Sequence, residues 1–253
     1  MDAFKYTTIA HRDRRLLMPV SDSAVDDLLQ RVSDERHTEP ATSLRALDVG
    51  CGKGEVLIRA AALLGATGIG VDQNASFIAE ARAAAAKRLP KDAVEFHGCR
   101  FEEFAFDDTP ISFVICTGAS HVFGDFPTAL TRVAARLDAR GWALFGEGFW
   151  QQPSAADYLA SFGGSADEMV SLPATLERAQ AAGFRVIAHR VSSPADWNAY
   201  ETSYFESMQR WLADNPTDPD APAFRAKSKN WFSAYQRWGH QTMGFVIMLL
   251  RKR

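Results

Sequence analysis

Three glycines at alternate positions carry the clearest chemical signal in this chain. They follow the apolar run Leu47-Asp48-Val49 as Gly50-Cys51-Gly52-Lys53-Gly54, and a helical pattern begins at Glu55. Glycine accepts positive φ and lets a ligand lie against bare backbone. A helix N-terminus also offers free N–H groups to an anion. The spacing therefore predicts a loop that binds a nucleotide-type cofactor.

A carboxylate follows about twenty residues later. Gly68-Ile69-Gly70-Val71 reads as a second strand that ends at Asp72. In a doubly wound fold, an acidic residue at this point accepts hydrogen bonds from the ribose hydroxyls of the cofactor. The alternative role for Asp72 is to cap a helix that begins near Asn74.

The glycine spacing also distinguishes between cofactors. A dinucleotide loop needs Gly-x-Gly-x-x-Gly, and the third position, counted from Gly50, is Glu55. A Walker A loop needs a glycine at position 47, which is Leu47. A nicotinamide dinucleotide is therefore disfavoured, and a nucleotide triphosphate bound in the Walker manner is excluded.

Composition narrows the class of partner. The 253 residues carry a formal net charge of -3, which gives no overall attraction to nucleic acid or to anionic membranes. Cys51, Cys99 and Cys116 show neither zinc-site spacing nor an even count for disulfides, so no metal site is expected. Residues 1–10 lack a signal-peptide pattern, and the apolar run 242–250 is too short to span a bilayer. We expect a soluble, cytoplasmic protein.

Strand and helix patterns alternate through the middle of the chain, which predicts a parallel sheet covered on both faces. After a helix over 23–32 and a polar loop over 33–43, the predicted strands are 44–49, 68–72, 93–97, 111–117 and 142–147, and the predicted helices are 55–64, 74–88 and 126–137. A helix over 173–182 and strands over 184–191 and 243–250 complete the core.

The organisation is interpreted as one domain over 1–253. Residues 1–43 form an N-terminal leader, 44–191 and 241–253 form the core, and 192–240 form a helical insertion. Asn215-Pro216-Thr217-Asp218-Pro219-Asp220 breaks the insertion into two helical patterns. The insertion carries many aromatic side chains, which must be covered either as a lid over the site or as the surface of a homodimer.

These residues resemble a known family. Asp48-Val49-Gly50-Cys51-Gly52-Lys53-Gly54 looks like motif I of the class I S-adenosylmethionine-dependent methyltransferases, and Gly70-Val71-Asp72 looks like their motif II. Within that family the chain resembles an uncharacterised bacterial subfamily over roughly its whole length. The subfamily landmarks are His11-Arg12 with Pro19, Cys116-Thr117-Gly118-Ala119-Ser120, Gly146-Glu147 with Trp150 and Pro153, and Trp211-Leu212-Ala213-Asp214-Asn215-Pro216.

The resemblance implies a Rossmann-like, doubly wound α/β fold with a mainly parallel seven-stranded sheet, whose last strand is antiparallel, and S-adenosylmethionine as cofactor. Ligands in such sheets lie beyond the carboxyl ends of the strands, where the resemblance has Asp48 hold the cofactor indirectly. The cofactor-binding residues expected there are Asp48, Gly50, Cys51, Gly52, Gly54, Asp72, Gln73, Cys99, Arg100, Phe101, Cys116, Thr117 and Gly118.

Arg100 departs from the family pattern. An acidic residue usually lies there, near the adenine amino group, and Arg100 cannot accept that proton. Either the backbone around Arg100 and Phe101 recognises adenine, or Arg100 is a solvated charge that points outward.

Two residues are candidates for catalysis. His121 follows the fourth core strand, and an imidazole can take a proton from an acceptor at neutral pH; otherwise it ends a turn. Glu147 ends the fifth strand, where a carboxylate either orients an acceptor hydroxyl or amine or is a surface charge at a packed edge. Methyl transfer from a sulfonium needs mainly alignment and exclusion of water, so the acceptor stays open.

We expect a small-molecule acceptor enclosed by the leader and the insertion. A nucleic-acid methyltransferase is the first alternative, and Cys116-Thr117-Gly118-Ala119 lacks the Asn/Asp-Pro-Pro-aromatic motif of many such enzymes. A protein methyltransferase and a protein that binds the cofactor without catalysis are further alternatives. A nicotinamide oxidoreductase is weakened by Glu55.

Overall fold

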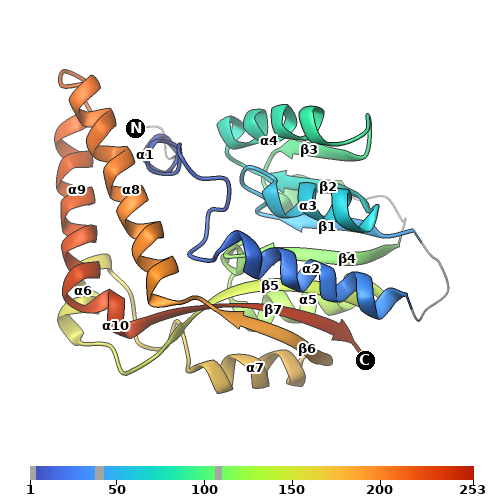
Figure 1. The fold of residues 1–253 in the computed structure, drawn as a ribbon. Coiled ribbons are helices and arrows are strands. Elements are labelled where there is room, and N and C mark those ends of the chain that lie inside the picture. Colours follow the sequence, from blue (N-terminus) through green and yellow to red (C-terminus); the bar gives the residue numbers. More distant parts are fainter. Residues whose placement is uncertain (1–3, 38–42, 106–109) are drawn as a thin grey trace.

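A computed structural model describes residues 4–37, 43–105 and 110–253. Its centre is a seven-stranded sheet in the order β3-β2-β1-β4-β5-β7-β6 (Figure 1). The strands are β1 Arg45–Val49, β2 Thr67–Asp72, β3 Val94–Gly98, β4 Ile111–Thr117, β5 Leu137–Trp150, β6 Phe184–Val191 and β7 Met243–Lys252.

The first five strands run parallel, and β7 pairs antiparallel with both β5 and β6. Because β1 pairs with β2 on one side and β4 on the other, the chain leaves β1 in one direction and later returns past it. The predicted fold class, a doubly wound and mainly parallel seven-stranded sheet with an antiparallel last strand, is confirmed.

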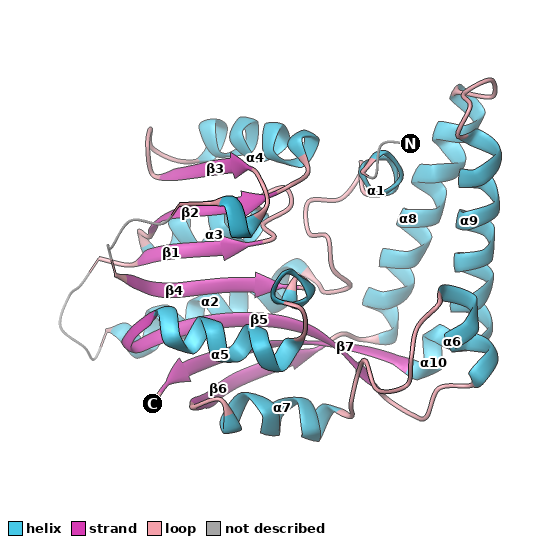
Figure 2. Ribbon diagram, turned by 180° about the vertical axis from the view of Figure 1, so that it is seen from behind, coloured by secondary structure: helices cyan, strands magenta, loops and turns pink. Residues whose placement is uncertain are grey.

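Helices cover both faces of the sheet, as Figure 2 shows from behind. Helices α2, α3 and α4 share one apolar cluster with the sheet, and α5 and α7 share the other. The helices are α1 Lys5–Ala10, α2 Asp22–Arg36, α3 Glu55–Leu64, α4 Ala75–Arg88, α5 Phe126–Arg136, α6 Ala156–Phe162, α7 Leu172–Ala181, α8 Pro194–Asp214, α9 Ala221–Ala234 and α10 His240–Thr242. Two short 3-10 helices are η1 Phe101–Glu103 and η2 Ser120–Phe123, and Tyr235–Gly239 forms a π-helical turn.

Some boundaries differ from the sequence prediction. Helix α2 continues to Arg36, into the segment predicted as a loop, and the rest of that prediction over 38–42 lies outside the described residues. Strand β5 begins at Leu137 instead of 142, because Leu137 pairs with Ile111 before a register shift. Helices α1 and α6 were not predicted; both are short and neither has a side-chain cap. Their stability therefore depends on tertiary contacts.

The aromatic segment folds as a long antiparallel hairpin of α8 and α9 beside the carboxyl ends of the strands (Figure 1). Helix α1 packs on this hairpin in a third apolar cluster, where Tyr6 meets Phe224 edge to face at 5.1 Å. Inside the hairpin, Phe205 and Phe232 stack with their ring centroids 4.4 Å apart. Among the described residues, the large apolar side chains that are exposed are Leu63 and Val191, and neither belongs to the hairpin.

Glu55, which stands where a dinucleotide loop has glycine, is buried at the start of α3. Its carboxylate accepts hydrogen bonds from Arg59 Nε at 2.7 Å and Arg88 Nη1 at 2.5 Å. Burial raises the pKa of Glu55, but the hydrogen bonds from Arg88 and Arg59 outweigh it, so the pKa lies below its ordinary value. The network ties α3 to the end of α4.

Replacing Glu55 by Gln should lower the free energy of unfolding by about 2–4 kcal/mol, because two guanidinium groups lose a buried anionic partner. The folded-state pKa is depressed, so this stabilisation exists above the unfolded pKa and disappears as pH falls through the folded one. Urea unfolding at pH 7 and pH 3.5 measures both effects. Glu177→Gln, on an exposed part of α7, is the control, and a difference that does not shrink in acid would contradict the explanation.

Candidate cofactor and acceptor site

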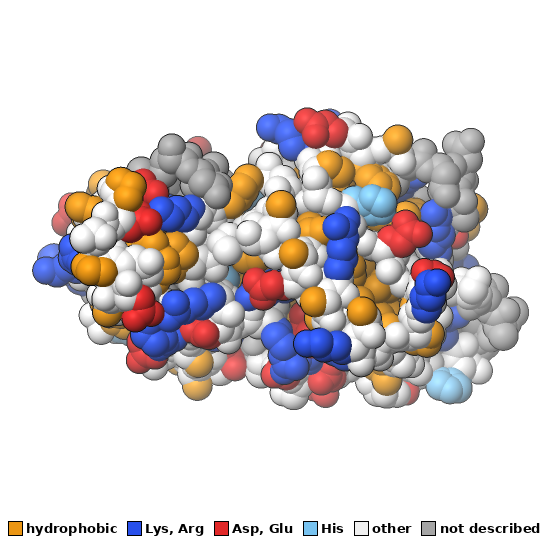
Figure 3. Space-filling model, turned by 90° about the horizontal axis from the view of Figure 1, so that it is seen from above, with side chains coloured by type: hydrophobic (Ala, Val, Ile, Leu, Met, Phe, Trp, Pro, Cys, Tyr) orange, Lys and Arg blue, Asp and Glu red, His pale blue; other side chains and the backbone are white. Residues whose placement is uncertain are grey.

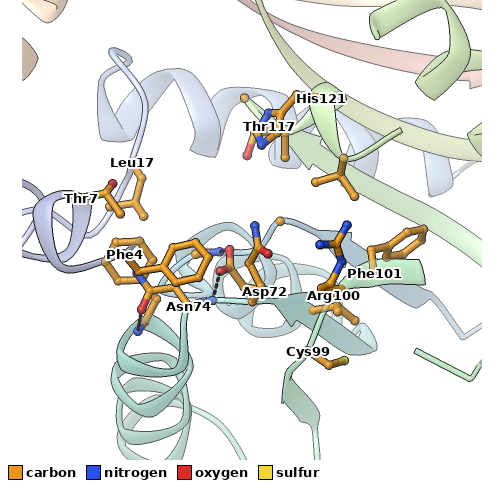
Figure 4. Close-up of a pocket in the computed structure, with 18 of the residues that line it drawn as sticks. Phe4, Thr7, Leu17, Asp72, Asn74, Cys99, Arg100, Phe101, Thr117 and His121 are labelled. Atoms are coloured by element: carbon orange, nitrogen blue, oxygen red, sulfur yellow. Dashed lines mark hydrogen bonds between the residues drawn. The ribbon is translucent and has the colours of Figure 1, made fainter. Parts of the chain in front are cut away.

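A cavity of about 450 Å³ opens at the carboxyl ends of β1, β2, β3 and β4. Figure 4 shows side chains from these strand ends and from the N-terminal segment converging on it. Ten of the residues predicted for the site line it: Gly50, Gly52, Asp72, Gln73, Cys99, Arg100, Phe101, Thr117, Gly118 and His121.

The glycine loop depends on the absence of side chains. Gly50 has φ 64°, and a Cβ added there would lie 2.4 Å from Ala119 Cβ. Gly54 is the N-cap of α3 with φ 70°, and a Cβ there would lie 2.4 Å from the Phe96 ring. Both residues have a left-handed backbone conformation and leave no space for a Cβ, so each position requires glycine for two separate reasons.

Asp72 fastens the loop to the second strand. Its Oδ2 accepts from the Gly52 backbone N–H at 2.9 Å, and its Oδ1 accepts from the Asn74 N–H at 2.8 Å. The N-cap of α4 is Asn74, whose side chain accepts from the backbone of Ser76 and Phe77. Asp72 is therefore not the cap of that helix, and each of its oxygens retains a lone pair at the cavity wall.

Several predicted residues lie behind the cavity wall. Asp48, Cys51, Gly54 and Cys116 do not line the cavity. Asp48 is 2% exposed, and burial, followed by the nearby Asp72 charge, raises the pKa of its carboxyl well above the ordinary value. A hydrogen bond with the Leu57 backbone opposes that rise, which places Asp48 at the first turn of α3.

The segment after β3 forms another part of the wall. Cys99, Arg100 and Phe101 all line the cavity. The Arg100 side chain is 64% exposed and pairs with Glu102, Nε to Oε2, at 3.7 Å. In Figure 4 the Arg100 guanidinium rises beside the Phe101 ring. Phe101 in turn packs edge to face on Phe123, with centroids 5.1 Å apart.

The two candidate catalytic residues lie differently. His121 lines the cavity from η2 and is exposed there. Glu147 does not line the cavity; its carboxylate lies beneath η2, hydrogen-bonded with Ser120 and the Gly148 backbone. Its Oε2 is buried and has no hydrogen-bond partner among the described residues. Burial raises the pKa of Glu147 to about 7, and those two hydrogen bonds hold it from rising further.

The N-terminal segment supplies residues that sequence analysis did not place in the site. Phe4, Thr7, His11 and Leu17 line the cavity opposite the strand ends. The ring nitrogens of His11 are both engaged, Nδ1 with the Thr7 carbonyl at 2.9 Å and Nε2 with the Tyr200 hydroxyl at 2.8 Å. Burial lowers the pKa of His11 to about 4, so the ring is neutral at pH 7. The sequence signals for this contribution were the His11-Arg12 landmark and the expectation that the leader encloses the acceptor.

The described residues contain neither a cluster of metal ligands nor a helix that could cross a membrane. Nowhere in 4–37, 43–105 and 110–253 do three or more His, Cys, Asp or Glu side chains gather as metal ligands. In the same residues, no helix combines the length and the apolar character needed to cross a bilayer.

Comparison with known proteins identifies the class. Residues 46–141 match the methyltransferase domain family, and this segment contains the glycine loop, Asp72 and His121. A SAM-dependent methyltransferase from Geobacter sulfurreducens, solved in complex with S-adenosyl-L-homocysteine, is 26% identical with a TM-score of 0.85 over 98% of both chains. Residues 46–141 are therefore a methyltransferase domain, and over nearly its whole length the chain is similar to S-adenosylmethionine-dependent methyltransferases, which confirms the predicted resemblance, enzyme class and cofactor.

The chain is also similar over its whole length to an uncharacterized protein. The uncharacterized protein YjhP of Escherichia coli (strain K12) is 27% identical over 256 residues, covering all of both chains. Its X-ray structure superposes with a TM-score of 0.88 over 98% of this chain and 99% of that one, at 25% identity. A methyltransferase from Thiobacillus denitrificans, in complex with S-adenosyl-L-homocysteine, matches over 100% of both chains with a TM-score of 0.88 at 24% identity.

The Glu147 carboxyl should make stability depend on pH near neutrality. Its folded-state pKa of about 7 exceeds the ordinary 4.5, so its contribution is greatest below 4.5 and is lost as pH rises through 7. Glu147→Gln has no such loss. The melting temperature of the variant, relative to wild type, should therefore increase between pH 5 and pH 8. A constant difference across this range would contradict the buried, protonated carboxyl.

Proposed function

We propose that this enzyme transfers a methyl group from S-adenosylmethionine to a small-molecule acceptor by in-line displacement within the 450 Å³ cavity. The observation that carries the proposal is the pairing of a side-chain-free glycine loop with the Asp72 carboxylate on one wall. When bound, S-adenosylmethionine supplies a methyl group that is already activated on a sulfonium. The chain's own residues then have to hold the donor, align the acceptor with it and exclude water.

The cavity fits the donor on several separate grounds. The backbone of Gly50 and Gly52 offers close approach at the start of α3, where helix N–H groups favour the donor's carboxylate. The remaining lone pairs of Asp72 suit the two ribose hydroxyls. The Arg100 guanidinium would stack on the adenine, and the Phe101 ring would make apolar contact with it. Asp48, Cys51 and Cys116 would support this wall from behind.

The acceptor would lie between His121 and the N-terminal segment. His121 is the exposed ionisable side chain on η2, so it is assigned the role of proton acceptor. Glu147 is assigned a positioning role, because its contact is with Ser120, next to His121, and not with the cavity. The neutral His11 and its tyrosine partner would form the opposite wall.

A small acceptor is favoured by the way the site is covered. Segment 4–17 and the α8–α9 hairpin contact each other beside the cavity, and the hairpin uses its aromatic side chains internally. This supports the lid interpretation of residues 192–240 over the homodimer interpretation. On the face seen in Figure 3, basic and acidic side chains are interspersed instead of gathered by sign. Such a face offers no basic track for a nucleic-acid backbone.

Replacing Asp72 by Asn should weaken binding of S-adenosylhomocysteine about tenfold to a hundredfold. The reason is that a charge-assisted hydrogen bond contributes roughly 1.5–3 kcal/mol and Asn offers one acceptor oxygen instead of two. Titration calorimetry measures the change, with NAD as a ligand expected not to bind. Asp157→Asn on exposed α6 is the control. Unchanged affinity in the Asp72 variant would remove Asp72 from the cofactor site.

Replacing His121 by Asn should lower kcat by roughly a hundredfold or more for a hydroxyl or amine acceptor, while donor binding is unchanged. Formation of S-adenosylhomocysteine, measured with pools of small amines, alcohols and thiols across pH 5–9, would test this. If the variant keeps wild-type turnover with every pool, His121 is not the base; turnover only with tRNA or duplex DNA added to the screen would overturn the small-molecule proposal.

A further inference from the structure

Lys53 lies inside the glycine loop, yet its side chain is turned away from the position expected for the cofactor. The residue is 6% exposed, and it is absent from the lining of the cavity. Its ammonium group makes three close contacts: with the His11 carbonyl at 3.0 Å, the Arg12 carbonyl at 3.2 Å and Glu80 Oε2 at 2.7 Å. An ammonium has three N–H donors, so every donor of this buried charge is used.

The two carbonyl groups belong to the turn that ends α1. Helix α1 has six residues, lacks a side-chain N-cap and ends at Ala10, with His11 as its C-cap. Carbonyl groups at a helix C-terminus need donors and favour a positive charge. Lys53 donates to the carbonyls of His11, the C-cap residue, and Arg12, the residue after it, so its positive charge lies at the C-terminus of α1.

Other contacts hold the same segment over the loop. Leu17 packs against Gly52 so closely that an added Cβ would lie 2.7 Å from Leu17 Cδ1. On the other side, Asn74 Nδ2 donates to Thr8 Oγ1 at 2.8 Å. Because Asn74 directly follows Asp72 and Gln73 in the cavity wall, segment 4–17 is joined to both strand-end loops of the cofactor site.

We infer that Lys53 is a positioning residue that fastens segment 4–17 over the donor cavity, so that the loop that holds the cofactor also holds the segment that covers it. The inference rests on the proposed function, since it takes the cavity to be the donor site. Cofactor exit then requires the Lys53 contacts to open. The acceptor wall includes Thr7 and His11 of the same segment, so its position also depends on the Lys53 side chain.

The test compares Lys53→Met, which keeps an unbranched side chain of nearly the same length but has no donors, with Lys53→Arg, which keeps the charge and several donors. Lys91→Met, at an exposed position after α4, is the matched control. Hydrogen exchange of amides in residues 5–17 is measured without ligand. The dissociation rate of S-adenosylhomocysteine is measured by rapid dilution from the loaded protein.

Lys53→Met should increase exchange in residues 5–17 and accelerate dissociation of S-adenosylhomocysteine by about tenfold or more, because three hydrogen bonds are lost together. Exchange in β1 and β4 should be unchanged, and Lys53→Arg should restore most of the wild-type behaviour. If Lys53→Met does not fold, Glu80→Gln weakens one contact by removing the charge of the exposed partner, and it should raise both quantities by a smaller factor.

The outcomes separate the inference from the proposed function. Unchanged exchange in residues 5–17, or unchanged dissociation with increased exchange, would overturn the fastening role. A uniform increase in exchange over the whole chain would show that Lys53 serves only general stability, which also overturns it. If wild type does not bind S-adenosylhomocysteine, the proposed function fails by that result alone, and exchange in the ligand-free variants still decides whether Lys53 holds the segment.

Discussion

The pairing of β1 with both β2 and β4 is the constraint on which the rest of the molecule depends. The connection after β1 leads toward β2, and the connection after β4 leads away from it toward β5. No helix of the described residues therefore bridges the carboxyl ends of β1 and β4. A crevice remains there, as it does at the switch point of other doubly wound sheets. The glycine loop, Asp72, the turn after β3 and η2 all face this crevice because each follows the end of a strand.

The polar groups around the crevice are divided by depth. Asp72 lies at the wall and binds the loop backbone, whereas Asp48 and Glu147 lie behind it, where burial raises their pKa values. Charge is thus kept where a ligand can use it, and deeper carboxyl groups resist ionisation. The same division explains why two residues close in the folded chain, His121 and Glu147, receive different roles, one facing the cavity and the other supporting η2 through Ser120.

The sequence predicted the core well because its signals are local. Glycine spacing, the apolar period of each strand and the helix after Gly54 are all decided by neighbouring residues, and the bounds of α3, β4 and β6 agree with the structure. The contribution of Phe4, Thr7 and Leu17 could not be found in this way, because α1 has no side-chain N-cap and its partners are distant: Lys5 binds Asp218 and Asp220, and Thr8 binds Asn74. The depth of Glu147 was missed for a related reason, since its burial depends on η2 packing above it.

The link between α1 and the hairpin has a consequence for the order of folding. Lys5 and Asp218 are separated by more than two hundred residues. The entropic cost of bringing them together is offset only when both segments have been synthesised and can make their contacts. On a ribosome, strands β1 to β4 have all emerged before α9 is made, and domains generally form as their segments become available. Helix α1 therefore completes its contacts with the hairpin only after α9 has been made. Until then, contacts with Lys53 and Asn74 can hold segment 4–17 to the core.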